Sequence, residues 1–159
     1  MKRASHKLFA ALLICTAFVA FVSCRNGAVY SEFVVIPSGE WDENALPEFE
    51  FNIADKESAY DILLYVRHTE RYPYQNMWLF VRGNPQHYSD TIEFYLADDR
   101  GRWLGDKHHG FIEMPVLLET NYHFPDTGRY YFAIQHGMRD SVLRGVTDVG
   151  IEIVKKVRS

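Results

Sequence analysis

Strict alternation of apolar and polar residues is the feature that most constrains how this chain can fold. Phe49, Phe51 and Ile53 fall on one face of an extended segment, while Glu50 and Asn52 fall on the other. A period of two residues is typical of a β-strand with one buried face, and helical periodicity is not sustained anywhere beyond the N-terminal leader. Other strand-forming runs occupy residues 30–36, 60–67, 77–82, 91–96, 128–135 and 146–154.

Clusters of turn-forming residues separate these runs. Gly, Pro, Asn, Asp or Ser gather at residues 54–58, 83–85, 98–101 and 125–128, where they favour chain reversals. About seven or eight short strands with such punctuation predict an all-β fold, a single antiparallel β-sandwich of jelly-roll or immunoglobulin-like type, over residues 30–159. Only residues 138–144, within the last crossover, could form a helical turn. The pattern leaves the strand order open.

Aromatic residues are expected to supply much of the core. The chain has 10 Tyr, 11 Phe and 3 Trp, and each such ring can bury a large apolar area. We also assign Tyr65, Trp78 and Phe80 to packing, because they lie inside expected strands. The main core candidates are Phe49, Phe51, Leu64, Val66, Leu79, Val81, Ile92, Phe94, Tyr130, Phe132, Ile134, Ile151 and Ile153.

The N-terminus has the organisation of a bacterial lipoprotein signal peptide. Lys2, Arg3 and Lys7 precede an apolar run that ends at Ser23 and Cys24. The run is too short to span a membrane comfortably but suits a secretory signal. We therefore predict a signal peptide at residues 1–23, lipidation of Cys24, and a tether at residues 24–29. An ordinary signal peptide, or an uncleaved anchor with an incidental cysteine, is the alternative.

Charge and cysteine usage exclude several classes of function. The chain has 17 Lys and Arg against 21 Asp and Glu, and removal of the leader would make it more acidic. An acidic domain has no general attraction for nucleic acid, so none is expected as a partner. Cys15 would leave with the signal peptide and Cys24 would carry lipid, so no thiol would remain for a disulfide, a nucleophile or a metal site.

Two polar clusters could suggest chemistry. His108 and His109 resemble part of a metal site, with Asp106 or His123 as further ligands, but no recognised spacing links these residues and a polar loop is the simpler interpretation. Residues 98–101, Asp-Asp-Arg-Gly, lack the spacing of a calcium loop and read better as a turn. No serine lies in a G-x-S-x-G elbow. We expect no metal, no cofactor and no catalytic residue.

Aromatic and basic residues in loops are the better candidates for binding. Exposed rings could stack on sugars, so Tyr72, Tyr74, Trp41 and Trp103 are candidates for a carbohydrate- or peptidoglycan-binding module. A protein partner could instead contact residues 98–111 and 136–145. Met and Arg are enriched at such interfaces, and the residues expected to contact a partner there are Met138, Arg139 and Arg144. A simple turn and a packed crossover without a partner remain the alternative for these segments.

Several stretches together resemble the GldH family of gliding-motility lipoproteins from Bacteroidetes-type bacteria. They follow the family's order and cover nearly the whole mature chain. These stretches are residues 29–32 (VYSE), 72–81 (YPYQNMWLFV), 90–91 (DT), 96–98 (LAD), 101–105 (GRWLG), 124–125 (FP), 128–130 (GRY), 135–139 (QHGMR) and 145–150 (GVTDVG).

The resemblance implies a lipoprotein that supports surface gliding and the associated type IX secretion apparatus, and it implies no catalytic residues. The expected partners are other lipoproteins or membrane proteins of that machinery. Arg25 and Asn26 follow the lipidated cysteine, with no aspartate for inner-membrane retention and no early acidic run for surface export. We therefore expect the protein on the periplasmic face of the outer membrane.

Overall fold

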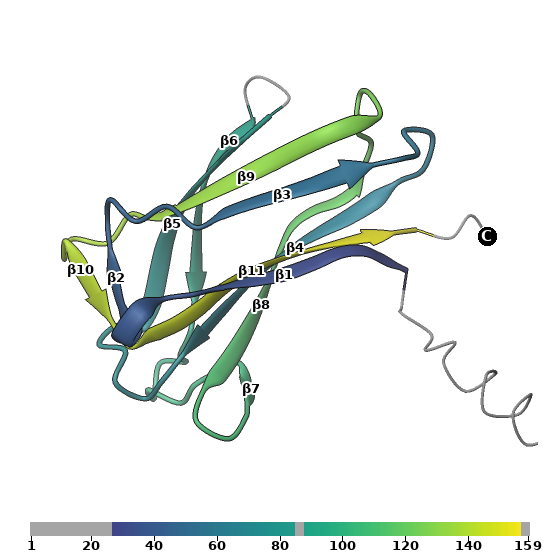
Figure 1. The fold of residues 1–159 in the computed structure, drawn as a ribbon. Coiled ribbons are helices and arrows are strands. Elements are labelled where there is room, and N and C mark those ends of the chain that lie inside the picture. The colour runs from purple at the N-terminus through teal and green to yellow at the C-terminus, as the bar shows by residue number, and fades with distance from the viewer. Residues whose placement is uncertain (1–26, 85–87, 157–159) are drawn as a thin grey trace, which may run out of the picture.

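Two antiparallel sheets face each other in the computed structural model, which describes residues 27–84 and 88–156 (Figure 1). The first sheet has the order β1 (Ala28–Val35), β11 (Val146–Lys155), β4 (Tyr60–His68), β8 (Ile112–Tyr122) and β7 (Asp106–Lys107). The second has the order β3 (Glu48–Ile53), β9 (Gly128–His136), β5 (Asn76–Gly83) and β6 (Tyr88–Tyr95). A short pair, β2 (Glu40–Asp42) and β10 (Val142–Arg144), lies at one end beside the 3₁₀ turn η1 (Pro37–Gly39).

The strand order is that of a jelly roll. When β2, β7 and β10 are set aside as short strands, the remaining described strands can be renumbered 1 to 8 along the chain. The two sheets then have the orders 1-8-3-6 and 2-7-4-5, with antiparallel pairing throughout. This arrangement corresponds to the double-sheet jelly roll and not to the immunoglobulin order. The all-β sandwich prediction is therefore confirmed, and the structure supplies the order that the sequence left open.

Alternation along the strands produces the core between the sheets. The residues of β3 alternate between exposed and buried along the whole strand, as the sequence pattern predicts. Phe51 stacks on Tyr130 of β9 with ring centroids 6.0 Å apart, and it also contacts Tyr30 of β1 at 5.4 Å. Because β1 belongs to the other sheet, this second contact joins the two layers.

The predicted core is largely correct. Of the candidates, only Ile92 is half-buried, and it still packs against the core, while the others are buried. The assignment of Trp78 to packing is wrong, because this side chain points outward from β5 and is 39 % exposed. Tyr65 and Phe80 are half-buried on the outer faces of their sheets. In each case the residue lies at the outward position of its strand, and residue type alone does not distinguish the two faces.

The longest strand, β8, was not predicted. Pro115 interrupts its apolar pattern, and proline is normally a signal against a central strand. In the structure β8 pairs with β4 along its length, whereas β7 covers its other side only at Ile112 and Glu113. Pro115 lies opposite Tyr65, beyond the reach of β7, in the part of β8 that forms a sheet edge. An edge position tolerates proline because the missing N–H is not needed by a neighbouring strand.

The predicted helical turn at residues 138–144 is wrong. The segment bends and then forms β10, which pairs with β2 through Leu143 and Trp41. Both side chains are fully buried, and the indole N–H of Trp41 donates a 2.8 Å hydrogen bond to the carbonyl of Ala45. Strand pairing and burial of Leu143 therefore outweigh the weak helical preference of this short segment.

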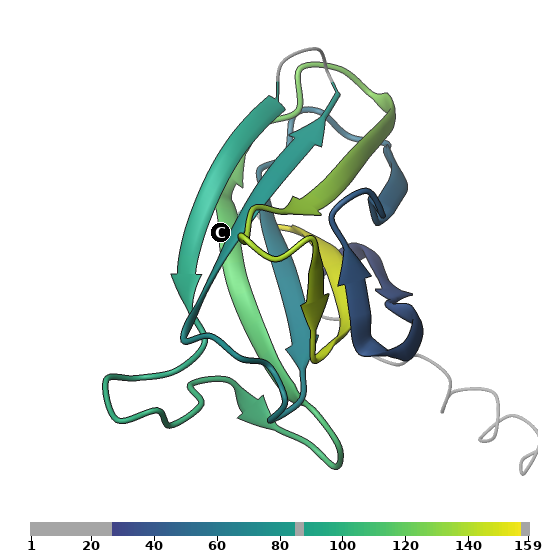
Figure 2. The ribbon, with the colours of Figure 1, turned by 90° about the vertical axis from the view of Figure 1, so that its left-hand side faces the viewer.

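The chain enters the domain at one end of the sandwich, and a group of connecting segments forms the opposite end. At one end, the carbonyl of Gly27 accepts a hydrogen bond from the N–H of Lys155 at 2.8 Å, and Lys155 also pairs with Asp55 in the turn after β3. We call this the proximal end, because the chain enters the domain here. At the opposite, distal end lie segments 36–47, 69–75, 97–111 and 137–145; Figure 2 looks onto η1, β2 and β10 from this side.

Candidate functional site

Backbone hydrogen bonds tie three distal segments together at Gly145. Its N–H donates to the carbonyl of Gly39, and its own carbonyl accepts from the N–H of Thr69, both at 2.7 Å. Gly145 has a φ of 86°, and a Cβ there would lie 2.5 Å from the backbone nitrogen of Tyr72. Only glycine combines the left-handed conformation with this close approach.

Tyr72 is a core residue and not an exposed loop aromatic. It is buried, and its hydroxyl donates a 2.8 Å hydrogen bond to the carbonyl of Asn76. Its ring packs near His68 and Trp103, and Trp103 is half-buried against the core. The expectation that Tyr72 and Trp41 offer free ring faces to a ligand is therefore wrong, because packing occupies both rings. Trp103 retains one partly exposed side.

Two buried histidines lie where strands end at the distal side. His68 packs edge-on against Trp103 with centroids 4.6 Å apart, and His136 packs against Trp41 at 5.3 Å. Each ring has one nitrogen near a backbone carbonyl, of Thr69 and of Trp41 respectively, and one buried nitrogen without a hydrogen-bond partner. Burial lowers the pKa of both histidines below the usual value. Both rings are therefore neutral at pH 7.

Tyr74 connects the start of β5 to the crossover before β10. It is half-buried, and its hydroxyl donates a 2.7 Å hydrogen bond to Oδ2 of Asp140. This hydrogen bond is the main reason that the pKa of Tyr74 is raised. Arg139 precedes Asp140 in the same crossover, and its positive charge opposes this rise in the pKa.

An open hollow of about 440 Å³ lies beside Trp78, lined by Tyr74, Asn76, Trp78, Gly137, Met138 and Arg139. It contains three of the predicted contact residues, Tyr74, Met138 and Arg139. Gly137 leaves the neighbouring position without a side chain; a Cβ there would lie 2.9 Å from the ring of Phe80. Met138 approaches from the crossover, where its Sδ accepts a 3.3 Å hydrogen bond from the N–H of Trp78. Sequence reasoning missed Trp78 because its outward orientation depends on strand register.

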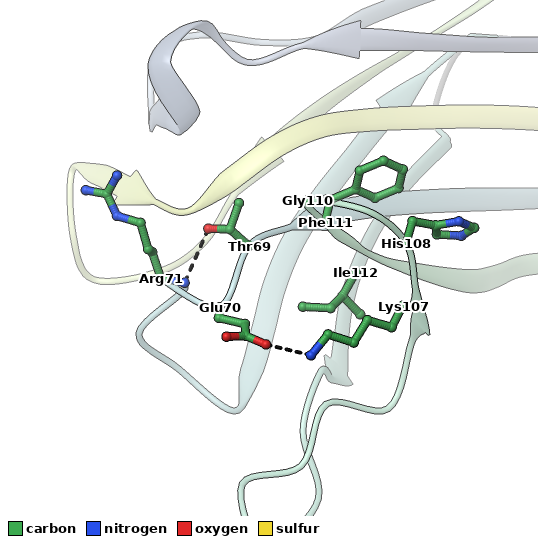
Figure 3. Close-up of a pocket in the computed structure, with 8 residues that line it drawn as sticks. All are labelled: Thr69, Glu70, Arg71, Lys107, His108, Gly110, Phe111 and Ile112. Carbon is green, nitrogen blue, oxygen red and sulfur yellow. Dashed lines mark hydrogen bonds and ion pairs between the residues drawn. The ribbon is translucent and has the colours of Figure 1, made fainter.

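A second hollow, of about 300 Å³, lies between the end of β4 and the loop before β8 (Figure 3). Lys107 donates to Glu70 at 2.7 Å across it, and the N–H of Arg71 donates to Oγ1 of Thr69 at 3.2 Å. His108 stacks on Phe111 with ring centroids 5.0 Å apart. His108 and His109 are both exposed, as expected for a polar loop.

Two smaller features complete this end. Asp98 accepts hydrogen bonds from the N–H groups of Arg100 and Arg102 at 2.9 Å, so residues 98–101 form the expected turn. The bonds from Arg102 lower the pKa of Asp98. Within the described part of the chain, no group of three or more His, Cys, Asp or Glu side chains is placed to hold a metal ion.

The hollows neighbour one another around the distal end. Two further hollows are present there: one is lined by Pro73, Asp140, Val142 and Arg144, which follow the lining of the Trp78 hollow in sequence, and the other by Glu40, Thr69, Arg71 and Arg144 among others. They share Arg144, and the second shares Thr69 and Arg71 with the hollow of Figure 3. We call this surface the distal trough. It includes all the predicted contact residues except Trp41, Tyr72 and Trp103.

The fold and its distal trough define a jelly-roll domain with a row of shallow hollows at one end. A family model, the GldH lipoprotein, matches residues 28–153. The chain therefore belongs to the GldH lipoprotein family, which confirms the resemblance inferred from its motifs. Cys24, the predicted lipidation site, lies outside the described residues. No helix among residues 27–84 and 88–156 is long and apolar enough to cross a bilayer.

Two relatives match over nearly their whole length. A gliding motility lipoprotein GldH homolog from Christiangramia forsetii is 31 % identical, covering 92 % of this chain and 96 % of the relative. The gliding motility lipoprotein GldH of Flavobacterium johnsoniae is 26 % identical, covering 91 % of this chain and 95 % of the relative. Among solved structures, a family GH115 4-O-methyl-α-glucuronidase aligns with a TM-score of 0.48 and 11 % identity, over 82 % of this chain but 17 % of that enzyme.

Proposed function

We propose that this protein is a lipid-anchored, non-enzymatic component of a gliding-motility and type IX secretion-associated assembly of the cell envelope, and that it acts through protein contacts. Its two relatives are gliding motility lipoproteins by name. Membership of the GldH lipoprotein family supports the anchor. The link to type IX secretion comes from the family resemblance.

The observation that carries this proposal is the orientation of the domain, in which the chain enters from the proposed lipidation site at one end and the distal trough lies at the other. Gly27 lies at the proximal end, three residues after Cys24. A tether of that length reaches about 10 Å at most. Lipid on Cys24 therefore holds the proximal end against the membrane. The distal trough then stands about 30 Å away, roughly the length of β11, and faces proteins instead of lipid.

The outer membrane, on its periplasmic face, is the proposed location. Arg25 and Asn26 follow the lipidation site, so the aspartate that would retain a lipoprotein at the inner membrane is absent from those positions. Confinement to a surface raises the effective concentration of the domain for partners on the same membrane. Weak contacts at the trough are then sufficient for assembly.

A deletion strain complemented with wild-type or Cys24→Ala protein tests this proposal. Deletion should reduce colony spreading or the secretion of envelope-exported proteins, and the wild-type gene should restore it. The Cys24→Ala protein should leave the membrane fraction, retain an unmodified N-terminal peptide by mass measurement, and fail to complement. Normal motility and secretion in the deletion strain, or full complementation by a soluble Cys24→Ala protein, would contradict the proposal.

Carbohydrate or peptidoglycan binding is the second candidate, and the exposed ring of Trp78 favours it. This ring lies next to Tyr74 and Arg139 in an open hollow, and sugars commonly stack on such rings. Pull-down with purified peptidoglycan and a glycan array would test the candidate. Binding that is lost in Trp78→Ala but kept in Tyr131→Ala, a similarly exposed aromatic elsewhere, would support it.

A further inference from the structure

We propose that the distal trough binds an extended, acidic segment of a partner protein, with a bulky apolar side chain of that segment beside Trp78 and its carboxylates at Arg139 and Arg71. This inference rests on the proposed function and specifies the surface and the partner's chemistry. Three features of the trough carry it: an apolar anchor point, unpaired guanidinium groups, and polar side chains that are already hydrogen-bonded.

The anchor point is the hollow at Trp78. The indole is 39 % exposed on the outer face of β5, and Gly137 on its flank lets Phe80 pack closely beside it. Met138 and Tyr74 form the other walls. Trp, Tyr and Arg dominate binding energy at protein interfaces, and Met is enriched there. A hollow of about 440 Å³ can accept a large side chain from a partner.

The charges along the trough select an acidic partner. Two of its acidic lining residues are held in ion pairs, Glu70 with Lys107 at 2.7 Å and Glu40 with Arg144 at 3.7 Å, and the third, Asp140, accepts a hydrogen bond from the Tyr74 hydroxyl. Neither Arg71 nor Arg139 makes an ion pair with another residue in the described ranges.

With Arg71 and Arg139 outside those ion pairs and Asp140 as the one remaining acid, the trough is slightly positive, although the chain as a whole has a net charge of −4. Guanidinium groups pair with carboxylates through directional, charge-assisted hydrogen bonds. Complementary charges of this kind select a partner and guide its approach.

A polypeptide fits these groups better than a sugar does. Recognition of sugar hydroxyls needs several free polar side chains beside the ring, and two of those at Trp78 are already partly used, since Asn76 donates to Glu93 at 2.7 Å and Tyr74 donates to Asp140. An exposed aromatic face and separate guanidinium groups lie along these neighbouring hollows. Alternating apolar and acidic side chains of an extended segment match that arrangement.

Site-specific photo-crosslinking in cells tests the inference with the full lipidated chain. Benzoylphenylalanine would replace Ser141, an exposed residue of the trough, and separately Tyr131, an exposed residue on the same sheet outside it. The probe at 141 should capture one protein through a segment that contains an apolar residue and carboxylates, and the probe at 131 should not. Trp78→Ala and Arg139→Glu should each lower the yield about tenfold or more.

Exchanging the charges of the two proposed partners tests whether a carboxylate of the captured segment pairs with Arg139. Replacing a captured carboxylate residue by arginine in the partner should restore crosslinking to the Arg139→Glu protein. Circular dichroism and thermal unfolding would verify that both variants fold; if Trp78→Ala does not, Arg139→Glu and the exchange still carry the test. A captured segment without acidic residues, a saccharide adduct at 141, equal yields in the variants, or failure of the exchange would each overturn the inference.

The failure of the inference can be distinguished from failure of the proposed function. Loss of motility or secretion on deletion, together with no crosslink at 141, removes the trough as the binding site and leaves the assembly role in place. A deletion without phenotype removes the assembly role, whatever the probe captures.

Discussion

The hydroxyl of Tyr74 donates a 2.7 Å hydrogen bond to Oδ2 of Asp140, joining two loops that are 66 residues apart. One loop leads into β5 and the other leads into β10. The contact therefore ties the crossover, which also carries Arg139, to the loop before β5 at the distal trough.

We predict that Tyr74→Phe loosens the crossover without unfolding the domain. The substitution keeps the ring and removes only the donor to Asp140. Amide hydrogen exchange should therefore become faster at residues 137–141 and stay unchanged in β4 and β11. Tyr131→Phe is the matched control, since Tyr131 is exposed on an outer sheet face away from this loop. Equal exchange in the wild type and in Tyr74→Phe would show that the bond does not hold the loop.

We predict that the domain loses stability as the pH falls below 6.5. Burial lowers the pKa of His68 and His136 from 6.5, so the unfolded chain binds protons there that the folded chain does not. Between that pH and the lowered folded pKa, each histidine costs up to about 1.4 kcal/mol per pH unit. The carboxylates with lowered pKa values add to acid sensitivity only at lower pH, below their own unfolded range.

Urea unfolding at pH 7, 6 and 5 measures this dependence. His68→Phe should flatten the slope because phenylalanine fills the aromatic cluster and does not titrate, and a double change with His136→Phe should flatten it further. A slope that both variants leave unchanged would assign the acid sensitivity to other groups.

We predict contrasting effects for two leucines. Leu64 on β4 is fully buried, whereas Leu117 on β8 is 57 % exposed. Leu64→Ala should lower the free energy of unfolding by about 2–5 kcal/mol because it removes core contacts and leaves a cavity. Leu117→Ala should change it by no more than about 0.5 kcal/mol. Chemical denaturation of the two variants gives both values, and similar losses would contradict the sheet orientation.

We predict that Gly145→Ala is more damaging than Gly110→Ala. Both glycines have positive φ, 86° and 99°, so either alanine strains the backbone by about 1 kcal/mol or more. A Cβ at 145 would also meet the backbone of Tyr72, whereas one at 110 has open space around it. The difference between the two thermal unfolding temperatures isolates the steric part, and equal temperatures would contradict the close approach at Gly145.

The residues themselves determined the all-β class, most of the core and the family. Period-two alternation places a strand's large side chains on one face whatever its neighbours are, which is why Phe49, Phe51 and Ile53 could be assigned to the interior. Turn residues marked the strand ends for a similarly local reason. Tyr74, Met138, Arg139 and Arg144 were predicted from their residue types as contact residues, and the structure places all four along the distal trough.

Tertiary structure decided what depends on pairing between distant segments. The strand order depends on which strands pair with one another across long stretches of sequence. Strand β8 could form through Pro115 because part of that strand lies at a sheet edge. Tyr72 and Trp41 became core residues because loops from elsewhere in the chain close over them. Trp78 became exposed because register turns it outward beside Gly137, 59 residues away in sequence. Local patterns record the conformation of a segment, but burial and charge pairing depend on the segments folded against it.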